Sequence, residues 1–154
     1  APYRGDLHLS VPYYGTRFEV IPGDGTLEGV VAVRSNTVAH VYLDGLGIEW
    51  TMHPSAESIA HAVASGQAKA GLVWGPDLAL LDSADYNAAF DAPAVLRWNQ
   101  HIAVRATDAD LLTQIDSVLA DIADDVVTLL DDNGIPAHAP FESTHVLDDL
   151  RSTP

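Results

Sequence analysis

The sequence predicts an α/β fold in which a parallel βαβ sheet is flanked by helices. Three predicted strands, which are the apolar runs at residues 30–33 and 70–74 and the segment 48–52 between them, alternate with two helical segments, at 38–46 and 54–64. Each strand-and-helix unit spans about 20 to 25 residues, which is enough for a right-handed crossover between parallel strands. The last run is apolar at every position, so it needs cover on both faces, as a central strand of such a sheet does.

Local signals set the limits of the two helices. Short polar side chains ending at Thr37 can cap the first helix, and Gly47 ends it. Pro54 and Ser55 open the second helix, whose apolar period stops at Gly66. Both helices therefore fit between the predicted strands.

Further elements are expected on both sides of this unit. They are strands at 7–11 and 17–21 joined to the unit by a turn at 22–25, one or two strands within 95–105, and one long helix from Asp108 to Asn133. The chain shows no internal repeat, so a single domain over residues 1–154 is predicted, with its core at 10–137 and a C-terminal tail at 138–154.

Composition excludes several classes of protein. With 154 residues and 47% hydrophobic content, the chain can bury roughly two-thirds of its unfolded surface, unlike a disordered or fibrous protein. The absence of cysteine removes disulfides, thiolate zinc sites and cysteine nucleophiles. No apolar run approaches the length of a membrane span, and Ala1-Pro2-Tyr3 is compatible with a mature terminus left by signal-peptide removal.

The negative charge is concentrated in the second half of the chain. The formal net charge is -15, which opposes binding to nucleic acid or to anionic membranes. Residues 1–76 contain 7 acidic and 4 basic side chains, whereas residues 77–149 contain 15 acidic side chains and only Arg97 and Arg105 as basic ones. Cations and basic proteins are therefore the expected partners.

No catalytic motif is present, so a non-enzymatic protein is expected. None of the seven histidines stands in the spacing of a zinc protease, and there is no Gly-x-Ser-x-Gly elbow. The glycines at 23 and 25 lack the strand-to-helix setting of a phosphate-binding loop.

Clustered carboxylates make a hard-cation site the main chemical hypothesis. Asp121, Asp124 and Asp125 are spaced to share one face of the predicted long helix, which carries no Lys or Arg between Asp108 and Asp132. A second candidate cluster lies in the tail, where helical spacing would bring together Glu142, His145 and Asp149. Several oxygen ligands suit Ca²⁺ and ions of similar size, although a solvated acidic face would show the same pattern.

Several segments together resemble the second half of a type II periplasmic solute-binding protein. They are Pro12-Tyr13-Tyr14, Val31-Ala32-Val33-Arg34-Ser35-Asn36-Thr37, Leu46-Gly47-Ile48-Glu49, Pro54-Ser55-Ala56, the run from Ala62 to Pro76, Ile102-Ala103-Val104-Arg105 and Asn133-Gly134-Ile135-Pro136. The Val73-Trp74-Gly75-Pro76 run is most similar to the solute-binding-like proteins that accompany periplasmic quinoprotein alcohol dehydrogenases in methylotrophic bacteria.

The resemblance implies a location, a role and a set of cleft residues. It implies an exported, non-enzymatic protein that works beside quinoprotein alcohol dehydrogenases, whose cofactor needs Ca²⁺ or a lanthanide ion. Together with the acidic second half of the chain, this context leads to the hypothesis of a periplasmic accessory protein that binds a lanthanide ion or Ca²⁺ through surface carboxylates and traffics or buffers it. The family's cleft would be faced by Tyr13, Tyr14, Arg17, Thr37 and Trp74. The match covers residues 10–137, and the family's preceding lobe is not matched, so half of a two-lobed cleft is expected.

Four other possibilities remain open at this point. Trp74 and Tyr13 can be packing residues at a strand end, with Arg17 a surface charge. The chain can instead be a docking module for a dehydrogenase or cytochrome, or a binder of a small organic solute. A surface cation with too few ligands can also be shared by two copies, which would give a metal-linked homodimer.

Overall fold

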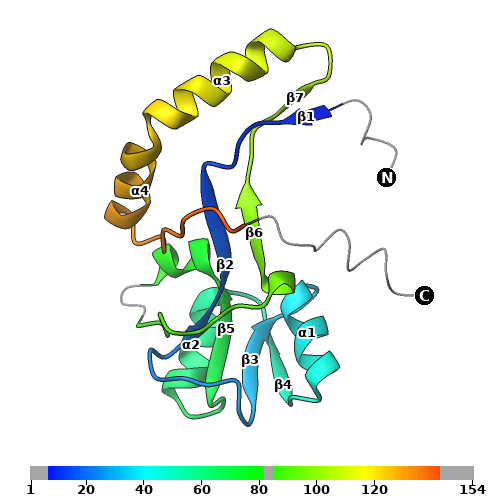
Figure 1. The fold of residues 1–154 in the computed structure, drawn as a ribbon. Coiled ribbons are helices and arrows are strands. Elements are labelled where there is room, and N and C mark those ends of the chain that lie inside the picture. The colour runs from blue at the N-terminus through cyan, green and yellow to red at the C-terminus, as the bar shows by residue number, and fades with distance from the viewer. Residues whose placement is uncertain (1–6, 82–84, 143–154) are drawn as a thin grey trace, which may run out of the picture.

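A five-stranded mixed sheet forms the centre of the protein (Figure 1). The structure is a computed structural model that describes residues 7–81 and 85–142. The strand order of the sheet is β4 (Trp50–His53), β3 (Val31–Arg34), β5 (Ala70–Trp74), β2 (Tyr14–Ile21) and β6 (Arg97–Gln100). β3 is parallel to both β4 and β5, which confirms the three predicted parallel strands. β2 runs antiparallel to β5 and β6, so the sheet as a whole is mixed.

The two crossover helices cover opposite faces of the sheet. α1 (Val38–Leu46) follows β3, and its Ala39 and Leu43 pack with alternate residues of β2, β3 and β5. α2 (Ala56–Ala64) follows β4 and packs against the other residues of the same strands. α1 has the bounds that were predicted for it. Every residue of β5 except Trp74 is buried, as a central strand requires.

Close packing between α2 and the sheet depends on the small residue Gly71 of β5. A Cβ placed on Gly71 would overlap Ile59 of α2 and lie 2.9 Å from Cγ1 of Ile21. Interiors are packed too densely to absorb such an addition without displacement. The position therefore holds α2 at a fixed distance from the sheet.

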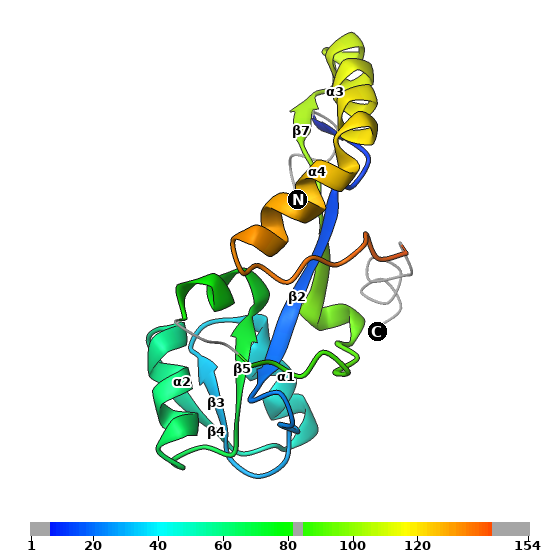
Figure 2. The same ribbon diagram turned by 90° about the vertical axis from the view of Figure 1, so that its left-hand side faces the viewer.

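A separate group of elements extends from the far end of β2 and β6, as Figures 1 and 2 both show. This arm consists of β1 (Leu7–Leu9), β7 (Ala103–Arg105), α3 (Ala109–Asp121) and α4 (Ala123–Asp132). β1 and β7 pair antiparallel, and α3 contacts both strands. Ser10 joins the arm to the sheet, because its hydroxyl accepts the N–H of Ile102 and its own N–H donates to the carbonyl of Ile102.

The prediction of one long helix over 108–133 is wrong, because the segment forms two helices. α3 ends at Asp121 and α4 begins at Ala123, with Ile122 between them outside helical geometry. Ile122 still donates to the carbonyl of Val118 and accepts from Val126, so most helical hydrogen bonds continue through the break. The apolar period alone could not reveal the change of direction.

The connections and the chain end complete the described structure. Short 3₁₀ helices, η1 (Gly75–Leu80) and η2 (Ala94–Leu96), follow β5 and precede β6. Residues 135–142 then cross β2 and β6, where the N–H of Gly15 donates to the carbonyl of His138 and the Asn99 amide exchanges two bonds with the backbone of Phe141. No helix in the described ranges is both long and apolar enough to cross a membrane.

Candidate functional site

A cavity of about 460 Å³ lies at the ends of the parallel strands β3 and β5. Its wall includes Arg34, which ends β3, and Trp74, which ends β5. The chain leaves β3 towards α1 on one face of the sheet and leaves β5 towards η1, which packs with α2 on the other face. Such a switch point at the carboxyl ends of strands is where open α/β sheets bind ligands.

Three aromatic rings form the apolar wall of this cavity. Phe18 of β2 lies opposite Trp74 in the strand register, and their ring centroids are 5.5 Å apart. Trp98 of β6 approaches the Phe18 ring at 6.1 Å and the Trp74 ring at 5.3 Å, edge to face. The mutual contacts hold all three rings in place, so the wall is formed before any ligand arrives.

The opposite side of the cavity carries polar groups. Thr37, the N-cap residue of α1, lines it, but the Thr37 hydroxyl donates to the carbonyl of Arg34 and makes no cap bond to the helix. Arg34 is 55% exposed and lies 3.5 Å from an oxygen of Asp77, which also lines the cavity. The first N–H groups of α1 and the Arg34 guanidinium together favour a negatively charged group here.

The second helix differs from the first at its N-terminus. Ser55 and Ser58 form a reciprocal capping box on α2, in which each hydroxyl oxygen accepts the backbone N–H of the other residue. The N-cap residue of α1 makes no such bond. A side-chain hydrogen bond with Ser55 is also the main cause that lowers the pKa of the exposed Glu57 carboxyl, with the Arg34 charge adding to the same direction. The start of α1 therefore differs from that of α2 in having no side-chain cap.

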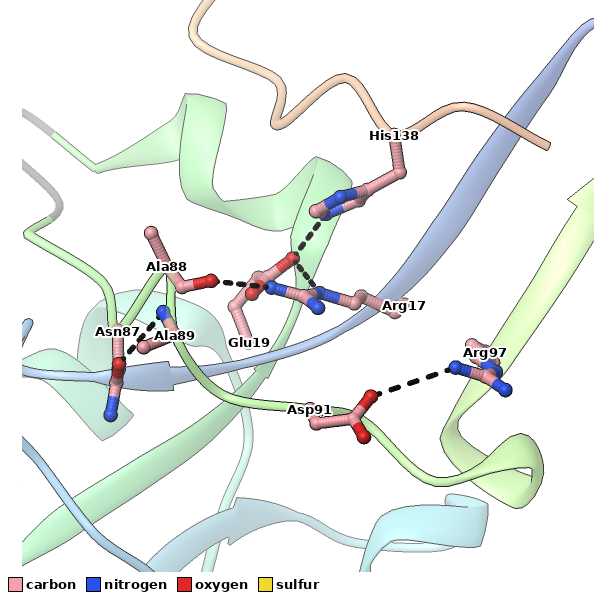
Figure 3. Close-up of polar contacts among 8 residues, drawn as sticks. All are labelled: Arg17, Glu19, Asn87, Ala88, Ala89, Asp91, Arg97 and His138. Atoms are coloured by element: carbon pink, nitrogen blue, oxygen red, sulfur yellow. Dashed lines mark hydrogen bonds and ion pairs between the residues drawn. The ribbon is translucent and has the colours of Figure 1, made fainter. Parts of the chain in front are cut away.

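A fully buried carboxylate lies in a second cluster, on the α2 side of β2. One oxygen of Glu19 accepts from Nε of Arg17 at 2.8 Å and lies 2.6 Å from Nε2 of His138 (Figure 3). The other Glu19 oxygen is buried without a hydrogen-bond partner in the described part of the chain. Arg17 also reaches towards the carbonyl of Ala88, so the cluster ties β2 to residues 85–91 and 135–142.

The predicted cleft residues are divided between these places. Thr37 and Trp74 line the cavity. Tyr13 and Tyr14 lie outside its lining, where their rings meet at an angle of 58° with centroids 5.3 Å apart. Burial, followed by the neighbouring Tyr13, raises the pKa of Tyr14. Arg17 is also outside the lining, because it sits on the opposite face of β2 from Phe18 and pairs with Glu19.

The predicted carboxylate ligands remain apart from these two clusters. Asp121, at the end of α3, and Asp124 and Asp125, in the first turn of α4, are exposed. Because Asp124 and Asp125 lie in the first turn of α4, the helix dipole favours their negative charges. Glu142 is the last described residue, and His145 and Asp149 lie outside the described residues. In residues 7–81 and 85–142, no group of three His, Asp or Glu side chains could hold a metal ion.

Sequence reasoning missed several of the residues that shape the site. Phe18 and Trp98 fall within segments that were predicted as strands, but neither was assigned to the cleft. Period-two alternation along β2 would have put Phe18 on the same side as Tyr14 and Thr16. Nothing local marked Glu19 or His138, which are 119 positions apart and meet only in the folded chain.

Comparison with known proteins identifies the fold. No protein-family model and no curated protein sequence matches the chain. The chain is similar to the unliganded, open L-cystine solute receptor of Neisseria gonorrhoeae, with a TM-score of 0.68 and 14% identity, over 92% of this chain and 65% of that one. It is also similar to MxaJ from Methlophaga aminisulfidivorans MPT, with a TM-score of 0.62 and 20% identity, over 85% of this chain and 71% of that one.

A third solved structure agrees with these two. Periplasmic binding protein XoxJ from Methylobacterium extorquens AM1 matches with a TM-score of 0.61 and 16% identity, over 87% of this chain and 75% of that one. At such identities the likeness is one of fold, and the chain spans about two-thirds to three-quarters of the length of these three structures. The protein therefore has the fold of type II periplasmic solute-binding domains, which include MxaJ and XoxJ.

Proposed function

We propose that the protein is a periplasmic binding-protein-like receptor whose cavity takes a small organic anion with an apolar body. The observation that supports this proposal is the pairing, in one cavity, of an aromatic wall with an uncapped helix N-terminus. A volume of about 460 Å³ is within the range of sites that hold small molecules.

The aromatic wall selects the apolar part of the ligand. Phe18, Trp74 and Trp98 already contact one another, so a flat or branched apolar group can pack on them without ordering new side chains. Preorganisation of this kind lowers the entropic cost of binding.

The polar side selects the charge. The Arg34 guanidinium is half exposed and its partner Asp77 is 3.5 Å away, so the pair is loose enough for a ligand carboxylate to compete. A carboxylate at the start of α1 would receive backbone N–H groups that Thr37 leaves free of side-chain bonds.

Two probes of equal shape test both parts of the proposal. Benzoate and benzamide are titrated while the emission of Trp74 and Trp98 is recorded, with Trp50 replaced by Phe to remove its background. We expect saturable binding of benzoate and about tenfold weaker binding of benzamide, a difference of about 1.4 kcal/mol. Arg34→Gln should remove that preference, whereas Arg105→Gln, which changes an exposed arginine of the arm, should preserve it.

Either of two results would contradict the proposal. Equal affinity for the two probes in the unaltered protein would refute the anion site. Lack of saturation by either probe up to millimolar concentration, in protein with normal circular dichroism, would refute the cavity as a receptor.

A second candidate function is favoured by the likeness to MxaJ and XoxJ, accessory proteins of methanol dehydrogenase systems. In that role the protein would act beside a quinoprotein alcohol dehydrogenase or its cytochrome, and its acidic second half would steer a basic surface towards it. Sedimentation with the purified dehydrogenase of the same bacterium tests this role. Complex formation that weakens with salt supports it, and its absence at low salt refutes it.

Binding of a lanthanide ion or Ca²⁺ remains a proposal supported by charge alone. Six aspartates lie between Asp108 and Asp132, and no Lys or Arg lies among them in the sequence. Calorimetry with Ca²⁺ and La³⁺ on chelator-treated protein should give heat that Asp124→Ala/Asp125→Ala reduces, or that Glu142→Ala reduces if the tail carries the site. Absence of heat at micromolar metal would end this hypothesis.

A further inference from the structure

A short segment near the end of the described chain passes very close to β2. Residues 135–142, which we call the strap, follow α4 and cross β2 and β6 (Figure 1). The strap meets β2 in a single β-bridge, in which the N–H of Gly15 donates to the carbonyl of His138. A Cβ on Gly15 would lie 2.7 Å from the carbonyl oxygen of Ala139 and 2.7 Å from Cε2 of Phe141. Gly15 therefore gives the strap room that any side chain would take away.

The strap also holds the neighbouring strand β6, at the position paired with Gly15. Gly15 and Asn99 lie opposite each other in the register of β2 and β6. The Asn99 side-chain amide donates to the carbonyl of Phe141 at 2.8 Å, and its oxygen accepts the N–H of Phe141 at 2.7 Å. The Arg97 guanidinium lies over the Phe141 ring, 5.1 Å from its centroid. The strap thus binds both strands, and its contacts with β6 are made by Arg97 and Asn99.

Trp98 lies between these two residues and faces the other side of the sheet. Side chains alternate along a strand, so Trp98 points away from the strap and into the wall of the cavity. β6 is an edge strand, which pairs only with β2 in the described part of the chain. The tilt of β6, and with it the direction of the Trp98 ring, therefore depends on contacts outside the strand ladder. The two bonds of Asn99 and the ring contact of Arg97 supply such contacts.

We propose that the strap positions Trp98 for ligand binding by holding β6 from the face opposite the cavity. No strap residue lines the cavity, so the strap acts only through Arg97 and Asn99. A displaced strap would leave the Trp98 ring free to move against Trp74 and Phe18, and the ligand would have to order that ring on binding. The orientation of Trp98 is independent of any ligand, whereas the effect on affinity rests on the function proposed for the cavity.

The two tryptophans of the cavity wall provide a signal that reports their geometry and not the stability of the fold. Trp50→Phe leaves Trp74 and Trp98 as the only indoles of the chain. Their ring centroids are 5.3 Å apart and their planes meet at 63°. Two indoles so close give an exciton couplet in ultraviolet circular dichroism, whose amplitude depends on their distance and mutual angle. Adding Trp98→Phe removes the couplet and gives the baseline.

Two variants that disturb the strap test the proposal in the Trp50→Phe background. Gly15→Ala forces the strap away from β2, and Phe141→Ala removes the ring that lies against Arg97. Each should lose most of the couplet and bind benzoate about fivefold more weakly, since one side chain of the wall must then be ordered on binding. Two controls should keep the couplet and the affinity of the background. They are Gly45→Ala, which adds a Cβ in open space on α1, and Phe141→Tyr, which retains the ring.

The couplet decides the proposal whether or not benzoate binds. An unchanged couplet in Gly15→Ala and Phe141→Ala, in protein that unfolds cooperatively, would overturn it even if benzoate binds normally. Equal losses in the two controls would overturn it too. A lost couplet confined to the strap variants, in protein that binds no benzoate at all, would support the role of the strap and refute the proposed receptor.

The two variants differ in their effect on folding. If Gly15→Ala does not fold, Phe141→Ala decides alone. Phe141 is only partly buried, and its replacement removes neither of the hydrogen bonds between the strap backbone and Asn99. A couplet that Phe141→Ala loses and Phe141→Tyr keeps then supports the proposal, and a couplet that both keep overturns it.

Discussion

Removing the charge of Glu19 should destabilise the protein more than any surface substitution of similar size. Glu19 has no exposed side-chain area, and a single oxygen serves both Arg17 and His138. Glu19→Gln keeps the shape of the side chain, but the oxygen that accepts both hydrogen bonds is no longer charged. This change should lower the free energy of unfolding by about 1 kcal/mol per bond and about 2 kcal/mol in total. Glu19→Leu also leaves Arg17 without a counter-ion and should cost about 3–5 kcal/mol.

Thermal unfolding followed by far-ultraviolet circular dichroism at pH 7 measures these costs. For a domain of this size about 2 kcal/mol corresponds to a midpoint about 4–8 °C lower. Asp91→Asn is the control, because Asp91 is 95% exposed and lies 3.7 Å from Arg97, so its loss should cost less than about 0.5 kcal/mol. If Glu19→Gln and the Asp91→Asn control have the same unfolding midpoint, the buried carboxylate does not stabilise the fold and the reasoning fails.

Three further changes have defined expectations. Gly71→Ala should lower the free energy of unfolding in urea by about 1–3 kcal/mol, because its Cβ would overlap Ile59. Gly45→Ala, with no atom within 4 Å of the new Cβ, should be neutral or stabilising. The reverse order of stabilities would contradict this account of the packing. Ser55→Ala should lower the free energy of unfolding, measured in the same way, by about 1 kcal/mol because it removes the cap of α2. Thr37→Ala should cost clearly less, because Thr37 makes no cap bond. Equal losses of stability in the two variants would refute this difference. A side-chain hydrogen bond from Arg105 is the main cause that holds the pKa of the Asp108 carboxyl below its ordinary 3.8, so this contribution to stability is present above the unfolded pKa and is lost as pH falls through the folded one. Arg105→Gln should raise the Asp108 pKa in a carboxyl NMR titration, and an unchanged titration would show that the contact is not made.

The parallel half of the sheet could be predicted from sequence because its signals are local. Strands at 30–33 and 70–74 are continuous apolar runs, and the helix at 38–46 ends at Gly47, whose positive φ of 67° favours glycine. The antiparallel placement of β2 between β5 and β6 depends on pairing between residues fifty or more positions apart, and no periodicity encodes that partner. The break at Ile122 was missed for a related reason, since the apolar stripe continues through it.

The cavity was predicted in part for a similar reason. Trp74 and Thr37 follow strands that the sequence marks clearly, so their position at the carboxyl ends could be inferred. Phe18 and Trp98 belong to β2 and β6, whose pairing was not predicted, so two of the three aromatic rings were not assigned. Arg17 was assigned to the cleft without regard to the alternation of side chains along its strand, and it points to the other face.

That alternation makes the register of β2 the feature on which both clusters depend. Phe18 joins the aromatic wall, while its neighbours Arg17 and Glu19 face the opposite side and meet His138. A shift of β2 by one residue would move Glu19 towards the rings of Trp74 and Trp98 and leave His138 against an apolar side chain. Burying an unpaired carboxylate among aromatic rings is far more costly than the shift of any apolar residue on this strand. The Arg17–Glu19–His138 cluster therefore specifies the register that places Phe18 in the cavity, although none of its three residues lines that cavity.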